Sequence, residues 1–371
     1  MPGQTPIPPP SKPLRLLVVC PSWLGDCVMA TPTLKRLREG LPGAFIGALV
    51  RPGMDELLAG LPYFDEFHVA RSSGVMGPKF VAAKIRPRRY DTTVLFTNSF
   101  STALIVRIAG IPRRIGYDRE VRGLLLTDRL TVPRTSDGRR SPVSAVTYYQ
   151  ALASRTLGTA TSGSGQALSN SKDRLSLFAT PGEEAAANAI FERAGVSLSA
   201  PRAILNPGGN NEAKRWPVDR FAAIAKHLHE GHRLAVFLNG SPGEADLVDE
   251  IAKQAGVPCV CLPRLGITIG ALKAIVRGSA VMVTNDTGPR HIAAAFDVPL
   301  VSLFGPTDPR WTTIPAPAGE WILVADPTLP ESEVADDHPD RCSIDRITLE
   351  SVREAADKAL MASADRNKPL S

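Results

Sequence analysis

The fold is decided by one stretch, residues 280–296, which reads AVMVTNDTGPRHIAAAF. Its first five residues form an apolar run typical of a buried strand, and the loop residues 285–288 separate that run from a helix around 291–296. Another apolar run follows at 300–304. Strand, loop, helix and strand in this order predict a βαβ unit, whose two strands lie parallel in one sheet.

The same alternation fills both halves of the chain. Residues 14–20 form a short apolar run, which is followed by a turn-like loop at 21–26 and by a helix that we expect to end near Arg38. Further buried strands are predicted at 45–50, 92–96, 203–205 and 234–238. The sequence therefore predicts an α/β protein with Rossmann-like, parallel sheets.

The length of 371 residues predicts two domains, because a single hydrophobic core rarely grows beyond about 250–300 residues. We expect an N-terminal tail at 1–13, a first domain at 14–190 and a second domain at 191–371. An amphipathic helix at 349–361 ends the second domain, from where it can pack back on the first.

The composition is that of a folded, basic protein. Hydrophobic residues make up 43% of the chain and charged residues 22%, which excludes a disordered or fibrous protein. The net charge of +6 favours an acidic partner, namely a phosphorylated glycolipid, an anionic membrane or a nucleic acid. The five scattered cysteines form no disulfide framework, and no apolar run approaches the roughly 20 residues that span a bilayer. We therefore expect a cytoplasmic protein whose membrane contact is peripheral.

Two loops of the second half combine small residues with hydrogen-bond donors, as phosphate sites require. Gly208 and Gly209 permit a close backbone approach, and Lys214 adds a positive charge. Thr287 and Gly288 open a helix whose free N–H groups favour an anion. Since the carboxyl ends of parallel strands meet at one edge of the sheet, a diphosphate is a ligand that fits both loops. Taken singly, each loop is more typical of a tight turn or a helix cap than of a phosphate site.

Asp26 ends the loop after the first strand, and the sequence supports two interpretations of it. A carboxylate directly before a helix that begins near Cys27 is typical of an N-cap. The alternative is a general base that faces the cleft between the domains and takes a proton from an attacking hydroxyl. In that role, the dipole of the following helix is expected to keep Asp26 ionised at neutral pH.

No metal site is predicted. His227, His229 and His232 are spaced by two, three and five residues, so they do not share one helical face, and we expect them to be solvated. Cys259 and Cys261 lack a second cysteine pair at zinc-ribbon spacing. The basic residues between 84 and 119 are either a solvated face or a surface that meets an acidic acceptor.

Three ordered motifs are spread over both halves of the chain. They read PSWLGDCVMA at 21–30, NPGG at 206–209 with AKRWP at 213–217, and TNDTGPRHIAAA at 284–295 with PLVSLFGPT at 299–307. Together they resemble the motifs of the lipopolysaccharide heptosyltransferases of glycosyltransferase family 9, especially the type that adds the second heptose to the inner core.

The resemblance implies a GT-B fold, in which two Rossmann-like domains face each other across a cleft. It also implies that the second domain binds ADP-heptose, that the first binds most of the acceptor, and that transfer inverts the anomeric carbon without a required metal or other cofactor. Asp26 is then the base and Lys214 holds the diphosphate. Arg290 departs from the family pattern, and we expect it to alter the contacts with the sugar. The other implied site residues are Gly208, Gly209, Glu244 (for the ribose), Asp286, Thr287, Gly288 and His291 on the donor side, and Trp23 and Gly25 on the acceptor side.

We therefore predict an inverting glycosyltransferase that moves a heptose from ADP-heptose to the inner-core saccharide of lipopolysaccharide. Its expected partners are the nucleotide sugar, an acidic lipid-linked saccharide and, transiently, the inner leaflet of the cytoplasmic membrane. We expect a monomer that binds no nucleic acid. The alternatives are a GT-B enzyme with another nucleotide-sugar donor, and a non-catalytic nucleotide-sugar-binding module in which Asp26 only caps its helix. The chain has neither a P-loop nor a GxGxxG motif after its first strand, which disfavours an ATPase and an NAD dehydrogenase.

Overall fold

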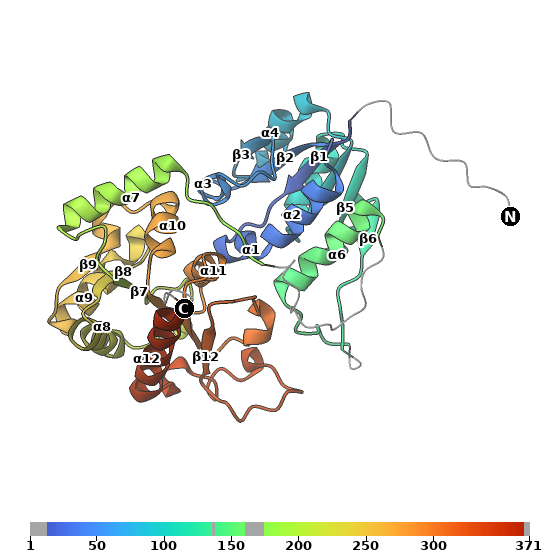
Figure 1. The fold of residues 1–371 in the computed structure, drawn as a ribbon. Coiled ribbons are helices and arrows are strands. Elements are labelled where there is room, and N and C mark those ends of the chain that lie inside the picture. Colours follow the sequence, from blue (N-terminus) through green and yellow to red (C-terminus); the bar gives the residue numbers. More distant parts are fainter. Residues whose placement is uncertain (1–12, 136–137, 160–173, 367–371) are drawn as a thin grey trace.

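The computed structural model describes residues 13–135, 138–159 and 174–366. Within these ranges the chain forms two α/β domains, each built on one six-stranded parallel sheet (Figure 1). The predicted α/β class and the two Rossmann-like domains are therefore confirmed. The predicted N-terminal tail, except for its last residue, lies outside the described residues.

The first sheet has the strand order β3-β2-β1-β4-β5-β6, and all neighbouring strands are parallel. Because β1 pairs with β2 on one side and β4 on the other, the strand order reverses at β1, and ligands bind in the crevice beyond such a switch point. The loop after β1 leads to Asp26. The strands are β1 (Arg15–Val19), β2 (Phe45–Val50), β3 (Glu66–Val69), β4 (Thr92–Leu95), β5 (Arg113–Tyr117) and β6 (Asp128–Leu130).

The second sheet repeats this design with the order β12-β11-β10-β7-β8-β9, again entirely parallel. Here the switch point lies between β7 and β10, so the two loops predicted to bind phosphate follow adjacent strands. The strands are β7 (Arg202–Asn206), β8 (Ala235–Leu238), β9 (Cys259–Cys261), β10 (Val281–Asn285), β11 (Leu300–Phe304) and β12 (Glu320–Val324).

Helices follow most of the strands and cover the faces of both sheets (Figure 1). Among the helices of the described residues, none is both long and apolar enough to cross a membrane. The helices are α1 (Leu24–Met29), α2 (Thr31–Gly40), α3 (Met54–Leu58), α4 (Gly77–Ile85), α5 (Phe100–Ile108), α6 (Ala145–Leu157), α7 (Pro181–Ala194), α8 (Val218–His232), α9 (Ala245–Ala255), α10 (Ile269–Arg277), α11 (Gly288–Ala295) and α12 (Leu349–Arg366).

The hydrophobic core extends across both domains. Leu16 and Val18 of β1 belong to one apolar cluster, whereas Leu17 and Val19, on the opposite face of the sheet, belong to another. This alternation explains why β1 is apolar at every position after the first. The first cluster continues into the second domain, where it includes Ile292 of α11. Since α1 packs directly against α11, burial of apolar surface holds the two domains together at the switch points.

The boundary predicted at residue 190 falls inside α7. Thr180 and Glu183 form a capping box at the start of this helix, in which each side chain accepts a hydrogen bond from the backbone of the other. The helix then packs along α10, where Glu183 pairs with Lys273 at 2.9 Å. Because α7 lies against α10 as one piece, the second domain begins near Thr180.

The final helix, α12, covers the second sheet rather than the first domain. It packs against α8 and strands β10, β11 and β12 (Figure 1). Its buried side chains, Val352, Ala356 and Ala359, belong to the apolar core of the second domain. The sequence also allowed this helix to pack back on the first domain, and that is not the packing observed.

Candidate active site between the two domains

The loops at the two switch points meet around one cavity of about 700 Å³. The first domain contributes α1 and the residue before it, and the second contributes the loops after β7, β8 and β10. All the predicted site residues except Arg290 line this cavity: Trp23, Gly25, Asp26, Gly208, Gly209, Lys214, Glu244, Asp286, Thr287, Gly288 and His291. The structure thus brings the predicted residues together, while their individual roles stay predictions.

A larger cavity of about 1580 Å³ adjoins the first and shares Asp26, Lys214, Asp286 and Thr312 with it. Arg119 and Arg140 line its first-domain side. The four shared residues therefore lie where two compartments meet, which is an arrangement suited to a reaction between two bound molecules.

Asp26 is not an N-cap. The helix begins at Leu24, its N-cap is Trp23, and no side chain caps it, so Asp26 is the third helical residue. Burial raises the pKa of Asp26, the hydroxyl of Tyr149 lowers it by donating to Oδ1 at 3.3 Å, and the charge of Asp286 raises it. The net shift is upward, opposite to the one expected from the helix dipole alone, and it makes Asp26 a stronger base than an ordinary aspartate.

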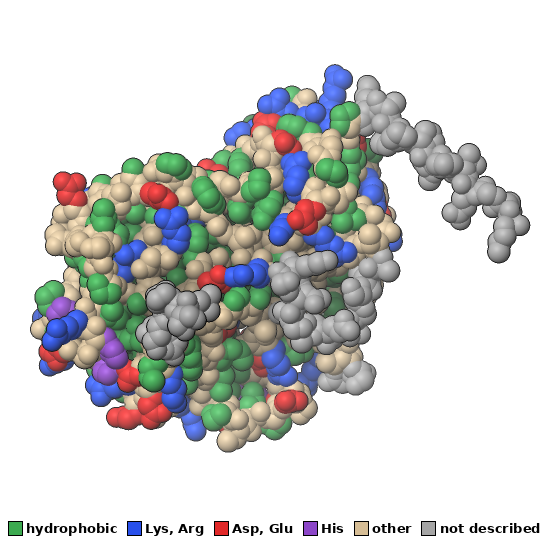
Figure 2. All heavy atoms as spheres, viewed as in Figure 1, with side chains coloured by type: hydrophobic (Ala, Val, Ile, Leu, Met, Phe, Trp, Pro, Cys, Tyr) green, Lys and Arg blue, Asp and Glu red, His purple; other side chains and the backbone are tan. Residues whose placement is uncertain are grey.

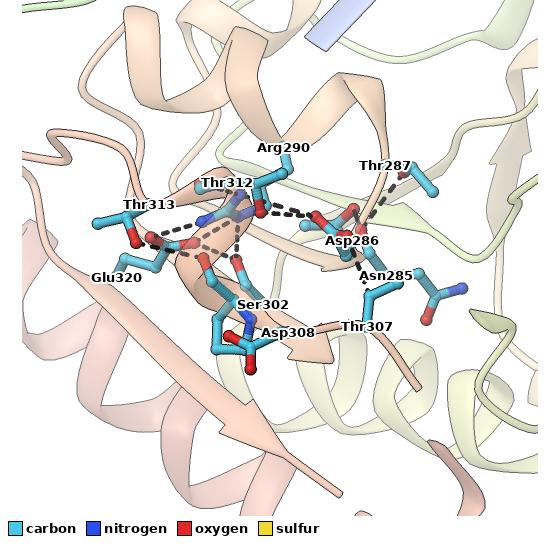
Figure 3. Close-up of polar contacts among 12 residues, drawn as sticks. Asn285, Asp286, Thr287, Arg290, Ser302, Thr307, Asp308, Thr312, Thr313 and Glu320 are labelled. Carbon is cyan, nitrogen blue, oxygen red and sulfur yellow. Dashed lines mark hydrogen bonds and ion pairs between the residues drawn. The ribbon is translucent and has the colours of Figure 1, made fainter. Parts of the chain in front are cut away.

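Asp286 is almost fully buried and is held on several sides (Figure 3). Lys214 Nζ lies 3.4 Å from Oδ2, which also accepts a hydrogen bond from Thr307 at 3.2 Å. Thr312 donates to Oδ1 at 3.3 Å, and the guanidinium of Arg290 lies 3.7 Å from the same oxygen. Asp286 therefore fixes the position of the Lys214 ammonium at the wall of the cavity.

Arg290 points away from the cavity, so the expectation that it alters sugar contacts is wrong. Its side chain is fully buried, and its Nε lies 2.6 Å from Oε1 of Glu320 in β12 (Figure 3). It also donates to the carbonyl oxygen of Thr312 at 2.9 Å. A buried guanidinium requires such partners. Arg290 thus supports the loop of Asp286 from the side that faces away from the cavity.

His291 lies one helical turn into α11 and is 3% exposed. Among the described residues, neither ring nitrogen has a hydrogen-bond partner. Burial, followed by the charge of Arg290, lowers the pKa of His291 to about 4, so the imidazole is neutral near pH 7. A methyl group on Gly25 would lie 2.7 Å from Nδ1, which explains why the first domain has a glycine where it faces this ring.

Both carboxylate oxygens of Glu244 accept hydrogen bonds from the backbone. Its Oε1 accepts from the N–H of Gly209 at 2.7 Å, and its Oε2 accepts from the N–H of Ser241 at 2.8 Å. Although burial raises the pKa of Glu244, the hydrogen bonds from Ser241 and Gly209 hold it below its ordinary value. A Cβ at Gly208 would lie 2.4 Å from this carboxylate. Because Gly208 has no Cβ, the carboxylate of Glu244 can lie close to this loop.

Thr287 is the N-cap of α11, but its side chain makes no capping bond. Instead, its hydroxyl accepts from Asn206 Nδ2 at 2.6 Å, and Oδ1 of Asn206 accepts from Asn239 at 2.7 Å. This chain of amides joins the carboxyl ends of β7, β8 and β10. The N-terminus of α11 is thereby left without a side-chain cap at the cavity, as an anion site requires.

Comparisons with known proteins show to which family the chain is similar. The family model for glycosyltransferase family 9 (heptosyltransferase) matches residues 80–336. Lipopolysaccharide heptosyltransferase 2 of Salmonella typhimurium is 30% identical over 317 residues, which cover 81% of this chain and 85% of that protein. The corresponding Escherichia coli protein is 30% identical over 310 residues, with the same coverage.

Solved structures agree as well. The structure of E. coli ADP-heptose LPS heptosyltransferase II matches with a TM-score of 0.74 and 25% identity, over 95% of this chain and 100% of that one. A glycosyl transferase of family 9 from Veillonella parvula has the same fold, with a TM-score of 0.77 at 22% identity, over 94% of this chain and 97% of that one. The two facing Rossmann-like domains are thus those of the GT-B fold, and the chain belongs to glycosyltransferase family 9, the heptosyltransferases.

Proposed function

We propose that this protein transfers a heptose from ADP-heptose to the inner-core saccharide of lipopolysaccharide, with inversion at the anomeric carbon. The observation that carries the proposal is the meeting of Asp26, from the first domain, with Lys214 and the N-terminus of α11, from the second, around one cavity. A base and an anion site on facing domains are what an inverting displacement of a diphosphate needs. The names of the relatives described above support the choice of donor.

In the proposed mechanism, the donor lies against the second domain with its diphosphate between Lys214 and the start of α11. Asp26 takes the proton of the acceptor hydroxyl as its oxygen attacks the anomeric carbon. The bond from that carbon to the diphosphate oxygen breaks, and ADP leaves with the electron pair. The Lys214 ammonium and the free N–H groups of α11 stabilise the charge that develops on the diphosphate, so we propose that no metal is required.

The acceptor is proposed to occupy the larger cavity. Arg119 and Arg140 line the wall of this cavity that belongs to the first domain, and their charges suit a phosphorylated or carboxylated saccharide. Lysine and arginine side chains are also frequent over the first domain on the face seen in Figure 2. We propose that the protein acts as a monomer and meets its lipid-linked acceptor by transient contact with the inner leaflet of the cytoplasmic membrane.

The test is release of ADP from ADP-heptose, measured in EDTA, with and without lipopolysaccharide that lacks heptose. Wild-type protein should release ADP only with the acceptor, and Asp26→Asn should lose this release while it still binds ADP with unchanged affinity. Full activity of Asp26→Asn would exclude Asp26 as the base. If the wild type is inactive with ADP-heptose but active with another nucleotide sugar, the heptose assignment fails and the family assignment stands.

A further inference from the structure

Two of the three histidines on α8 meet an aspartate of the final helix. Nε2 of His227 lies 2.8 Å from Oδ1 of Asp357, and Nε2 of His232 lies 2.7 Å from the same oxygen. The two imidazole rings are 5.2 Å apart and nearly perpendicular. The expectation that all three histidines are simply solvated is therefore wrong for this pair. His229 points elsewhere, and its Nδ1 lies 3.1 Å from the carbonyl oxygen of Leu234.

The end of α8 explains how a spacing of five residues brings two histidines together. His232 is the last residue of the helix, and Arg233 follows in the left-handed conformation, with φ of 55°. Five residues correspond to 500° around an ideal helix, which would place the two side chains about 140° apart. Here both instead reach one partner on α12, because the final turn of a helix is free to depart from ideal geometry.

From this convergence we propose that His227, His232 and Asp357 form a binding site for a divalent transition metal of the zinc type. The ligand atoms, one from each residue, all lie within 4.8 Å of one another. Two imidazole nitrogens and one carboxylate are a ligand set that Zn²⁺ accepts, with water in the fourth position. The three side chains are between 25% and 42% exposed, so an ion can enter and keep that water.

Binding would replace the hydrogen bonds between the histidines and Asp357 by bonds from the imidazole nitrogens and the carboxylate to the ion.

The place of the cluster points to a structural role. Histidine side chains are exposed on the part of the surface formed by α8 and its neighbours (Figure 2). None of the three residues lines either cavity of the candidate active site. A metal here would link the end of α8 to α12. Without it, α12 packs on the second sheet through apolar side chains such as Val352 and Ala356. We therefore expect the ion to stabilise the second domain without changing the rate of transfer.

The experiment uses the full chain, freed of any affinity tag and stripped with chelator, and titrates it with ZnCl₂ by calorimetry and by thermal unfolding. Wild-type protein should bind one ion at this site, and its Tm should rise by about 5 °C at a hundredfold excess over Kd. His227→Ala and Asp357→Asn should each weaken binding by at least about tenfold. His229→Ala is the matched control, because it removes a histidine of the same helix from outside the cluster.

Titration with Co²⁺ keeps the proposal testable if one of the variants is unstable. Visible absorption bands of a cobalt site should appear with the wild type and with His229→Ala, and should be absent with His227→Ala and Asp357→Asn. The proposal is overturned if the wild type gains no thermal stability from zinc, or if the cluster variants bind zinc and cobalt as well as the control does.

Discussion

Asp26 is the residue on which the chemistry should depend most strongly. Asp26→Asn keeps the shape of the side chain but cannot accept the proton, so we expect the rate of transfer to fall by about 10²–10⁴-fold. Donor affinity should be almost unchanged, because the residues proposed to hold the diphosphate belong to the second domain. Measurement of kcat with saturating acceptor, beside ADP binding by calorimetry, separates these two effects.

Tyr149 should tune the pH dependence of that base. Its hydroxyl donates to Asp26 and lowers the pKa of the carboxyl, against the larger effect of burial. Tyr149→Phe removes this hydrogen bond, so the pKa of Asp26 should rise further. Because the base must be deprotonated, the acidic limb of the kcat/KM profile should move to higher pH. An acidic limb that stays in place in the variant would contradict the assigned link between Tyr149 and the base.

At the scale of single residues, the sequence identified site residues in the loops after strands. It did not identify the side chains that contact them from distant parts of the chain. Gly208 and Lys214 were predicted because each lies in a short motif after a strand, and His291 was predicted from the resemblance of its motif to that of family 9. Tyr149 was missed, since it is separated from Asp26 by 123 positions and lies on another helix. The burial of Arg290 was missed for the same reason, because Glu320, which pairs with it, lies 30 residues later on β12.

At the scale of elements, the contact between α1 and α11 depends on glycine. In Gly25→Ala, the new methyl group would lie 2.7 Å from His291 Nδ1 and 2.9 Å from Cε1, and this ring is buried. The ring or the helix must therefore shift, and we expect transfer to slow by about 10–100-fold. Steady-state kinetics of the purified variant test this expectation.

Gly182→Ala provides the matched control for Gly25→Ala. Gly182 is the second residue of α7, as Gly25 is of α1, but nothing lies within 4 Å of its added Cβ. Since alanine is favoured in helices by about 1 kcal/mol over glycine, this variant should be as active as the wild type and at least as stable. Equal activity of the two variants would argue against a tight contact at α1 and α11.

The ion pair between α11 and β12 should contribute both to stability and to the donor site. Glu320→Leu leaves the buried guanidinium of Arg290 without its main partner, which should cost about 3–5 kcal/mol in the free energy of unfolding. The double variant with Arg290→Met should recover much of that stability in urea unfolding. The KM of the double variant for the donor should nevertheless stay raised, because the guanidinium of Arg290 no longer supports Asp286. Recovery of both quantities would leave Arg290 with a structural role only.

Secondary structure was predictable where apolar strands and loop residues alternate. It was less predictable where a tertiary contact determines the start of a helix or the domain to which a helix belongs. The sequence placed the start of the first helix near Cys27, because Gly25 and the residues before it are typical of a turn. In the structure the helix begins at Leu24, since this segment packs against α11. The assignment of α7 to the second domain likewise depends on its contact with α10, which the sequence of α7 does not encode by itself.

At the scale of the whole molecule, Lys273 links the two domains away from the cavity. Its ammonium is fully buried and donates to the carbonyl oxygens of Glu56, in α3, at 2.7 Å and of Phe178 at 2.8 Å. Lys273→Met removes these bonds and leaves Glu183 unpaired, so we expect a loss of about 3–5 kcal/mol. Calorimetry should then resolve separate unfolding transitions for the two domains.

Lys253→Met is the control for this link. Lys253 belongs to α9 and is largely exposed, and its one ion pair within the described part of the chain is with Glu250 of the same helix. Its replacement should change the stability by no more than about 0.5 kcal/mol. If Lys273→Met behaves in the same way, the buried ammonium is not what joins the domains.

Each sheet is built from one continuous stretch of chain, and within the described residues neither domain lends a strand to the other. A single genetic crossover near residue 180 can therefore exchange one complete half of the gene for that of a relative. If the first domain binds the acceptor and the second binds the donor, as proposed, such a hybrid would inherit its acceptor from one parent and its sugar donor from the other. The parents must match where the two halves meet, for example at the glycine of α1 against the histidine of α11 and at the lysine of α10 against α3. A new glycosidic linkage can thus arise in one recombination event, provided that these contacts are kept.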